Sequence, residues 1–499
     1  MTGRDFVLAI DQGTTSTRAI AFDAEGRARA AAQLPLTQIY PAPGEVEHDP
    51  EKIWRSVLTV GRGALRDIGA GSIVAIGITN QRETTLVWER SSGKPLANAI
   101  VWQDRRTAGL CDQLALEGWG DHVSKTTGLV IDPYFSATKL AWLLANVPGL
   151  AARANKGEVC FGTVDSFLLF RLTGGRAHVM EASNAARTML FDIEEGCWDE
   201  RLLARLAIPR AMLPELRDSQ DDFGVAESEH FGVPIPILGV AGDQQAAAYG
   251  QACFEPGMLK ATYGTGCFLL ANTGGAKIAS TSRMLSTVFH QIKGRRIFAL
   301  EGAIFMAGAT VQWLRDSLRL IADAGESEAL ARLADPNSGV YLVPAFQGLG
   351  APHWDAEARG AILGLTRGGS AADIVAAGLE AVAFQTRDLL EAMRRDMTAS
   401  GIPASASLRV DGGMTANGWF LQRLADILGE RVELAPQAET TALGAAYLAG
   451  QAAGFYGSQA DLQRAWVPGR VFEPDMSKQE ADARYRGWLD AVEKVRSKS

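Results

Sequence analysis

Short apolar runs that stop at small or polar residues recur along the chain and predict buried strands. The first run, Phe6–Ile10, turns back through Gln12–Ser16 into Arg18–Phe22, which predicts a hairpin. Similar runs at Ile73–Thr79 and Ile235–Val240 predict further strands. Because these strands alternate with helical patterns, the chain is expected to form an α/β fold.

The strand–turn–strand pattern returns in the second half of the chain. Met258–Tyr263 leads through a Gly-Thr-Gly turn into Cys267–Ala271, much as Phe6–Ile10 leads through Gly-Thr-Thr into its returning strand. Two copies half a chain apart indicate two domains of related topology. Taken alone, this repeated pattern fits a chance similarity equally well. We place the boundary near Gly250, which gives domains of residues 1–250 and 251–499.

Capping residues mark the starts of two helices. Asp49 and Pro50 are the residue types expected at an N-cap and at the first helical position. Ser370 and Asp373 form a predicted capping box before a long helix with one apolar side. Other elements are predicted at Thr84–Trp88, Ala99–Trp102, from Asp104 onward, Ser407–Val410, Gly418–Leu428 and Thr440–Ala449.

The composition is that of an ordinary globular protein. Of the 499 residues, 47% are hydrophobic and 21% charged, and the length suggests two to four domains. A net charge of −8 without blocks of like charge argues against binding nucleic acid or an anionic membrane surface. Glycine is unusually frequent, with 53 residues, which implies many tight turns or close backbone approaches. Gly444 lies among alanines and suits close helix packing.

Cysteine spacing and apolar stretches exclude other classes of protein. Five widely spaced cysteines without a C-x-x-C pair indicate neither a disulfide framework nor a zinc site, so a reducing cytoplasm fits best. The longest apolar stretch, Ala303–Leu314, is too short to span a bilayer. Acidic residues stand where a signal peptide would be apolar. We therefore expect a cytoplasmic protein without integral membrane association.

The first hairpin is the first candidate for phosphate binding, because the usual P-loop and dinucleotide-binding glycine motifs are absent from the sequence. Its turn gathers backbone N–H groups and the hydroxyls of Thr14, Thr15 and Ser16, which suit phosphate oxygens. Asp11 could hold Mg²⁺ through its water shell, and Arg18 could reach the same phosphates. Taken alone, the segment fits a plain hairpin better, because these residues are common turn formers.

Two further strand ends change that balance. The Ile235–Val240 strand leads to Asp243 and Gln244 at a helix start, where an aspartate is either a cap or a general base. Asp411-Gly-Gly, followed by Asn417, forms another turn into a helix and would let an adenosine lie against the backbone. Three such turns together predict a nucleotide site.

A polar and aromatic set suggests the second substrate. Arg82 and Glu83 stand side by side between two predicted strands, Trp102 ends a predicted strand, and Tyr134 follows a proline at a predicted helix start. Singly, each fits a surface ion pair or a core aromatic. Together they suit a small polyol, because arginine donates to hydroxyls, carboxylates accept from them, and aromatic rings cover the C–H face.

Ordered motifs over nearly the whole length resemble those of the FGGY carbohydrate kinases of the actin-like ATPase superfamily. Within that family they are most similar to the branch that phosphorylates glycerol. The resemblance rests on segments that include Ala9-Ile-Asp-Gln-Gly-Thr-Thr-Ser, Gly77-Ile-Thr-Asn-Gln-Arg-Glu-Thr-Thr, Val101-Trp-Gln-Asp-Arg-Arg-Thr, Ala241-Gly-Asp-Gln-Gln-Ala-Ala, Thr262-Tyr-Gly-Thr-Gly-Cys-Phe and Arg409-Val-Asp-Gly-Gly.

The resemblance implies two ribonuclease-H-like domains with ATP and the acceptor in a central cleft between them. The implied polyol site consists of Arg82, Glu83, Trp102, Tyr134, Asp243, Gln244 and Phe268. The implied nucleotide site consists of Thr14, Thr15, Ser16, Arg18, Thr265, Gly266, Gly308, Gln312, Gly413 and Asn417.

The implied reaction is ATP-dependent phosphorylation of glycerol to sn-glycerol 3-phosphate in glycerol catabolism. Asp243 would be the general base, and Mg²⁺ near Asp11 would bridge the phosphates of ATP. A homodimer or homotetramer is expected from the family. Alternatives are another FGGY sugar kinase, acting on xylulose, ribulose or gluconate, and a non-enzymatic actin-like ATP-binding module. The polyol set around Asp243 speaks against that module.

Two segments of the sequence are compared with regulatory segments of relatives in the family. Gly232–Ile235 lacks the arginine of the loop that binds fructose 1,6-bisphosphate in some bacterial relatives, so that inhibition is not expected. His230 loosely resembles a loop histidine that the phosphotransferase system phosphorylates in other relatives. An ordinary exposed loop histidine is the favoured interpretation.

Overall fold

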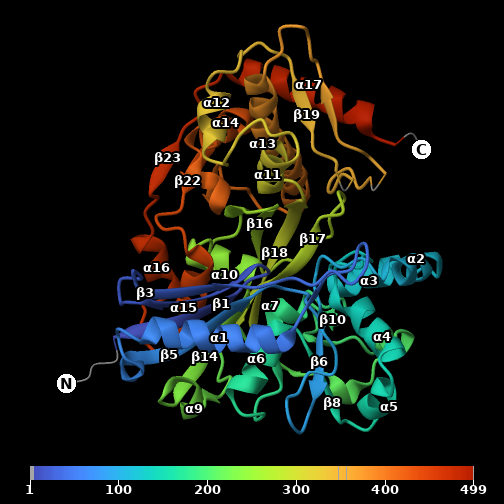
Figure 1. Cartoon of the computed structure of the whole chain (residues 1–499), viewed down its shortest axis with the longest axis vertical. Coiled ribbons are helices and arrows are strands. Elements are labelled where there is room, and N and C mark those ends of the chain that lie inside the picture. Colours follow the sequence, from blue (N-terminus) through green and yellow to red (C-terminus); the bar gives the residue numbers. More distant parts are fainter. Residues whose placement is uncertain (1–4, 347, 356, 498–499) are drawn as a thin grey trace.

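The computed structural model describes residues 5–346, 348–355 and 357–497. The first four residues, which carry part of the signal-peptide expectation, lie outside the described residues. Figure 1 shows two lobes, with most of the first half of the chain in the lower lobe and most of the second half in the upper lobe. The C-terminus lies on the upper lobe and the N-terminus on the lower.

A mixed sheet forms the centre of the first lobe, with the strand order β13-β14-β5-β1-β2-β3. Its strands are β1 (Phe6–Gln12), β2 (Ser16–Phe22), β3 (Ala28–Pro35), β5 (Ile73–Asn80), β13 (Val225–Ala226) and β14 (Ile235–Gly242). β1 pairs antiparallel with β2, and β2 antiparallel with β3, whereas β5 is parallel to both β1 and β14. The predicted first hairpin is confirmed.

The sheet of the second lobe repeats this topology. Its order is β17-β18-β16-β15-β21-β22-β23. Its strands are β15 (Leu259–Tyr263), β16 (Cys267–Gly274), β17 (Leu285–Ile292), β18 (Arg295–Ile304), β21 (Ser407–Asp411), β22 (Arg431–Leu434) and β23 (Arg470–Phe472). The run β18-β16-β15-β21-β22 has the same orientations as β3-β2-β1-β5-β14, two antiparallel pairings and then two parallel ones. The protein is therefore an α/β protein with two mixed-sheet domains of related topology.

Helices and short ribbons complete both lobes. The helices of the first half are α1 (Pro50–Leu65), α2 (Ala108–Leu116), α3 (Gly120–Thr127), α4 (Ser136–Asn146), α5 (Leu150–Asn155), α6 (Val164–Leu172), α7 (Ala182–Ala185), α8 (Glu200–Arg205), α9 (Ser228–Phe231) and α10 (Asp243–Gly250). Those of the second half are α11 (Gly308–Asp316), α12 (Glu326–Ala331), α13 (Ala371–Ala399), α14 (Gly418–Leu428), α15 (Thr440–Ala452), α16 (Gln459–Ala465) and α17 (Lys478–Val495). Short strands are β4 (Glu47–His48), β6 (Leu86–Glu89), β7 (Ala99–Ile100), β8 (Val159–Gly162), β9 (Val179–Glu181), β10 (Phe191–Asp192), β11 (Cys197–Trp198), β12 (Glu215–Arg217), β19 (Tyr341–Val343) and β20 (Ala361–Leu363).

Both predicted caps are confirmed, whereas the segment after β7 differs from expectation. The Asp49 side chain accepts a hydrogen bond from the Glu51 N–H, and Ser370 forms the capping box of α13. The predicted strand to Trp102 ends at Ile100, and the helix expected from Asp104 begins only at Ala108. The Asp104 carboxylate explains this difference, because it accepts from the Val46 N–H (2.6 Å) and from the Arg106 guanidinium and so organises a loop.

Helix α15 belongs to the second half of the chain but packs against β1, β5 and β14 of the first sheet and against α10. A Cβ atom on Gly444 would lie 1.8 Å from the Ala246 carbonyl oxygen of α10. The close helix packing expected of Gly444 is therefore present, and its partner is the helix that begins at Asp243. Figure 1 shows the two helices on the left side of the molecule, at the level where the lobes meet.

Three further observations concern the expectations for membrane spans, cysteines and His230. Within the described part of the chain, no helix is both long and apolar enough to cross a membrane. All five cysteines are free. His230 is only 6% exposed and packs edge-on against the Trp54 ring, so the expectation of an exposed loop histidine was wrong.

Candidate active site

Four buried charged side chains form a closed ring where the two lobes meet. The Arg82 guanidinium follows β5 and binds the Glu301 carboxylate on β18 through two contacts of 2.6 and 3.1 Å. Arg187, just after α7, lies 3.0 Å from Glu301 and donates from Nε to Glu83 at 2.6 Å. Glu83 completes the ring at 3.9 Å from Arg82 Nε. Each of the four residues is at most 2% exposed, so the surface ion pair considered for Arg82 and Glu83 is wrong.

The backbone of Glu83 adopts an unusual conformation that turns its side chain toward Arg187. Its φ is +60°, in the left-handed region that non-glycine residues seldom adopt. The hydroxyls of Thr85 and Ser136 both donate to the Glu83 carbonyl oxygen, at 3.0 and 2.9 Å. Backbone strain of this kind persists only where surrounding contacts enforce it, and it is common at functional sites.

The two carboxyls of the ring respond differently to burial. Burial raises the pKa of Glu83, and the charges of Arg187 and Arg82 only partly offset it. Burial also acts on Glu301, but Arg187 and Arg82 outweigh it and lower the pKa of that carboxyl. Glu301 is therefore the more firmly ionised member of the ring.

Asp243 is the first residue of α10 and lies beside this ring. Its Oδ1 is 3.2 Å from Arg82 Nε, and its side chain is 31% exposed, in contrast to the buried ring. Burial raises the pKa of Asp243, although Arg82 and Lys260 oppose this shift. The adjacent Gln244 accepts a hydrogen bond from Lys260 Nζ at 2.6 Å, which ties α10 to β15 of the second sheet.

The aromatic residues of the predicted polyol set lie next to the charged ring. Trp102 makes edge-on contacts with Tyr134 and Phe268, with ring centroids 5.6 and 6.3 Å apart. The Arg82 guanidinium lies 5.8 Å from the Phe268 ring centre. Trp102 lies in a turn beyond β7 rather than at a strand end, and Tyr134 precedes α4 rather than starting it. The predicted polyol residues are thus neighbours, although their local structures differ from the expected ones.

The first hairpin adjoins this set. The Trp102 indole N–H donates to the Thr14 hydroxyl at 2.9 Å, and the turn is closed by a hydrogen bond from the Gly13 N–H to the Ser16 carbonyl. Thr15 is exposed and Ser16 is partly exposed. Arg18 is not free, because its guanidinium pairs with Glu439 at the start of α15, 2.8 Å away.

Asp11 has an environment that fits a cation. Burial raises its pKa to about 7, Arg18 opposes this shift, and the charges of Asp243 and Glu439 add to it. Neighbouring carboxylates destabilise the charged form of Asp11, and a divalent cation would stabilise that charged form. The assignment of Mg²⁺ to Asp11 stays a prediction.

The second hairpin and the start of α11 form one compact unit. The N–H groups of Gly308 and Ala309 donate to the carbonyl oxygens of Gly264 and Thr265, at 3.0 and 2.9 Å. Gly264 and Thr265 are exposed and Gly266 is partly exposed. This unit places Thr265 and Gly308 together, as the predicted nucleotide site requires.

The third predicted turn lies beside that unit. Gly412 has a φ of +96°, and a Cβ there would lie 2.5 Å from the Tyr263 carbonyl oxygen, so only glycine fits. A Cβ on Gly308 would lie 3.6 Å from the Met414 side chain, which places the start of α11 next to this turn. Gly413 is exposed, and Asn417 caps α14 by accepting from the Phe420 N–H. Gln312 is exposed on α11.

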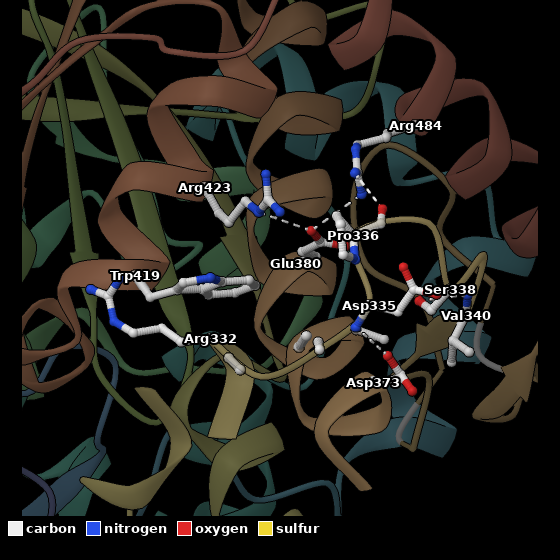
Figure 2. Close-up of a pocket in the computed structure, with 14 residues that line it drawn as sticks. Arg332, Asp335, Pro336, Ser338, Val340, Asp373, Glu380, Trp419, Arg423 and Arg484 are labelled. Carbon is white, nitrogen blue, oxygen red and sulfur yellow. Dashed lines mark hydrogen bonds and ion pairs between the residues drawn. The ribbon is translucent and has the colours of Figure 1, made fainter. Parts of the chain in front are cut away.

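A cavity of about 210 Å³ lies elsewhere, in the second lobe, and contains none of the predicted site residues. Figure 2 shows Arg423 and Arg484 pointing toward Glu380 inside it. The Glu380 carboxylate lies 3.2 Å from Arg423 and 3.7 Å from Arg484. Because Glu380 is paired with both arginines and no predicted site residue lines this cavity, it is not the candidate active site.

Sequence reasoning assigned no role to several charged residues at the site: Arg187, Lys260, Glu301 and Glu439. A signal existed for two of them, because Lys260 stands between Leu259 and Ala261, and Glu301 follows the apolar run Ile297–Leu300, within their strands. Such a position is costly unless the charge has a specific partner.

Known proteins resemble this chain over its whole length. Residues 6–250 match the N-terminal domain of the FGGY family of carbohydrate kinases, and residues 259–453 match its C-terminal domain. A glycerol kinase of Rhizobium rhizogenes is 56% identical over 99% of both chains, and glycerol kinase 1 of Pseudomonas aeruginosa is 56% identical over 99% of both chains.

Solved structures agree with the fold. The crystal structure of Plasmodium falciparum glycerol kinase with ADP superposes with a TM-score of 0.92 at 36% identity, covering 99% of both chains. A gluconate kinase of Lactobacillus acidophilus, at 21% identity and a TM-score of 0.87, covering 98% of this chain and 97% of that one, shares the fold. The two matched domains, the repeated sheets and the full-length similarity lead to one conclusion: the chain belongs to the FGGY family of carbohydrate kinases, within its glycerol kinase branch.

Proposed function

We propose that this protein transfers the γ-phosphoryl group of ATP to glycerol and forms sn-glycerol 3-phosphate. The observation that carries this proposal is the position of Asp243, partly exposed and 3.2 Å from the Arg82 guanidinium, next to Glu83 and the aromatic rings. Full-length similarity to proteins named glycerol kinase supports the same acceptor.

Asp243 acts as the general base in this proposal. A terminal hydroxyl of glycerol transfers its proton to an Asp243 carboxylate oxygen while the hydroxyl oxygen attacks the γ-phosphorus and the bond to the β-phosphate oxygen breaks. The raised pKa of Asp243 favours this role, because a carboxylate holds a proton better as its pKa rises. Arg82 and Glu83 bind the remaining hydroxyls, and Trp102, Tyr134 and Phe268 cover the C–H face.

The two hairpins receive the nucleotide. Exposed backbone and the side chains of Thr14, Thr15, Ser16 and Arg18 on one hairpin, and Thr265 and Gly266 on the other, bind the phosphates. Gly308, Gln312, Gly413 and Asn417 bind the adenosine side. Asp11 would hold Mg²⁺, which would supply charge neutralisation at the phosphates.

The larger assembly is part of the proposal. Residues 1–250 and 251–499 form the two domains, with α15 crossing from the second onto the first. A homodimer or homotetramer is expected in solution, and light scattering coupled to gel filtration tests it. A cytoplasmic location is part of the proposal, because five widely spaced cysteines without a C-x-x-C pair suit a reducing compartment.

A substrate panel tests the proposed function. Glycerol, xylulose, ribulose and gluconate are each offered with Mg-ATP, and ADP release is followed by a coupled assay. Turnover with glycerol well above the other acceptors is the expected result. A preference for a sugar would favour another FGGY kinase, and ATP hydrolysis that is independent of every acceptor would favour an ATP-binding module.

A further inference from the structure

The charged ring closes only because Glu301 reaches into it from the second lobe. Arg82, Glu83 and Arg187 all belong to the first half of the chain, whereas Glu301 lies on β18 and binds both guanidiniums. Two arginines that share one buried carboxylate would repel each other if that carboxylate lost its charge.

We propose that Glu301 is a positioning residue for the acceptor, which holds Arg82 directly and Glu83 through Arg187. The inference rests on the proposed function, because Arg82 and Glu83 are the residues expected to bind glycerol. Glu301 itself does not touch the acceptor in this proposal.

Arg82 is fixed by Glu301 along both of its terminal nitrogens. The two contacts form a fork of 2.6 and 3.1 Å, a geometry that orients the guanidinium plane as well as attracting its charge. Arg82 Nε, the nitrogen outside this fork, lies 3.2 Å from the Asp243 carboxylate and 3.9 Å from the Glu83 carboxylate. Glu301 therefore sets the angle at which Arg82 meets the acceptor.

Arg187 contacts both Glu301 and Glu83, so Glu301 also restricts the position of Glu83. Its Nη2 lies 3.0 Å from Glu301 while its Nε donates to Glu83 at 2.6 Å. Its guanidinium carbon also lies 5.4 Å from the ring centre of Tyr134, another predicted acceptor residue. The ring thus holds Arg82 and Glu83, the residues proposed to bind glycerol, and links their positions to the second sheet.

The test compares Glu301→Gln with a matched control, Glu380→Gln. Glu380 is also a buried glutamate of the second lobe that faces two arginines, Arg423 and Arg484, but it lies in the cavity of Figure 2, which contains no predicted site residue. Glutamine keeps the shape and removes the charge in both variants. The measurements are KM for glycerol, KM for ATP, the thermal midpoint, and glycerol binding by calorimetry without ATP.

Glu301→Gln is expected to raise KM for glycerol about 10- to 100-fold, the effect of losing one charge-assisted hydrogen bond, and to weaken glycerol binding equally. Its KM for ATP should stay within about twofold, and Glu301→Asp should recover part of the loss. Glu380→Gln should leave both KM values within about twofold, even where it lowers the thermal midpoint as much. An unchanged KM for glycerol in folded Glu301→Gln, or an equal change in both variants, would overturn the positioning role.

Two further measurements distinguish a failure of the positioning role from a failure of the proposed function. If Glu301→Gln does not fold, Arg187→Lys keeps the charge but loses the double contact, and it should show the same selective loss; an unaltered KM for glycerol there overturns the proposal. A wild-type protein that binds glycerol but does not phosphorylate it overturns the proposed function alone. A wild-type protein that binds no glycerol overturns both.

Discussion

Asp11 and Asp243 are neighbouring carboxyls with opposite proposed tasks, one holding a cation and the other a proton. The pKa of each is raised, first of all by burial, and Asp243 adds to the shift of Asp11. At the scale of single residues, the function depends on keeping these two charges apart. Arg82 beside Asp243 and Arg18 near Asp11 provide the separate counter-charges.

Asp243→Asn is expected to keep the fold and to lower kcat for glycerol phosphorylation at least about 100-fold, because asparagine cannot accept the proton. Steady-state kinetics with saturating Mg-ATP measure this effect. Asp67→Asn, an exposed aspartate just beyond α1, serves as the control and should be as active as the wild type. Near-normal turnover of Asp243→Asn would remove Asp243 from the role of general base.

Asp11→Asn is expected to stabilise the protein without nucleotide or cation, by an amount that grows between about pH 4 and pH 7 and is largest above neutral pH. The folded-state pKa of Asp11 is about 7, above the ordinary value of 3.8, so the folded protein holds this proton longer than the unfolded chain. Stability from this group is therefore lost as the pH rises from about 4 to about 7. At pH 8 the variant should melt on the order of 2 °C above the wild type, with no gain at pH 4. Equal differences at both pH values in a thermal scan would contradict the assignment.

Sequence could predict the elements whose signals lie within a few neighbouring residues. The Asp49 cap, the Ser370 capping box and both Gly-Thr hairpins are local features, and the structure confirms them. The charged ring could not be predicted, because the contact between Arg82 and Glu301 joins residues 219 positions apart. No local pattern records such a partner.

Local interpretation also failed where a side chain reorganises its own loop. Trp102 lies beyond β7, which ends at Ile100, and the Asp104 carboxylate holds the following loop by accepting from the Val46 N–H. His230 has a loop-like sequence but is covered by Trp54 of α1. In each case a contact with an element distant in the sequence decides the local structure or burial, whereas the neighbouring residues alone favour a different one.

At the scale of elements, the contact between α10 and α15 is set by backbone rather than by side chains. Gly444→Ala should therefore destabilise the protein by about 2 kcal/mol or more, because its Cβ would lie 1.8 Å from the Ala246 carbonyl oxygen. Denaturant unfolding measures the change. Gly109→Ala in α2 is the matched control: nothing lies within 4 Å of its Cβ, so alanine should be neutral or stabilising. An equal response of both variants would show that the helix contact is not tight.

At the scale of the whole molecule, the two lobes share a core. Val7, Ala9 and Ala75 of the first sheet pack against Ala442 and Ala446 of α15. The first sheet is therefore incomplete without a helix encoded almost 200 residues after it, as the start of α15 at Thr440 shows. Neither half is expected to be a self-sufficient folding unit, even though the two sheets repeat one topology.

A fragment of residues 1–250 should accordingly fold poorly when produced alone, because the apolar face under α15 would be exposed. We expect broad, weakly cooperative thermal unfolding by circular dichroism. Production together with residues 251–499 should restore a soluble complex and a sharp transition. A sharp transition in the isolated fragment would contradict the shared core.

The paired glycines of α10 and α15 also bear on how this molecule can change over evolutionary time. A Cβ on Gly250 would meet the Thr440 carbonyl oxygen at 2.1 Å, just as one on Gly444 would meet Ala246. Each of the two helices thus places glycine backbone directly against the backbone of the other, so no smaller side chain can be substituted there to make room for a larger neighbour. Mutations elsewhere can change one lobe independently of the other, but at the contact between α10 and α15 a change in one helix needs a compensating change in the other.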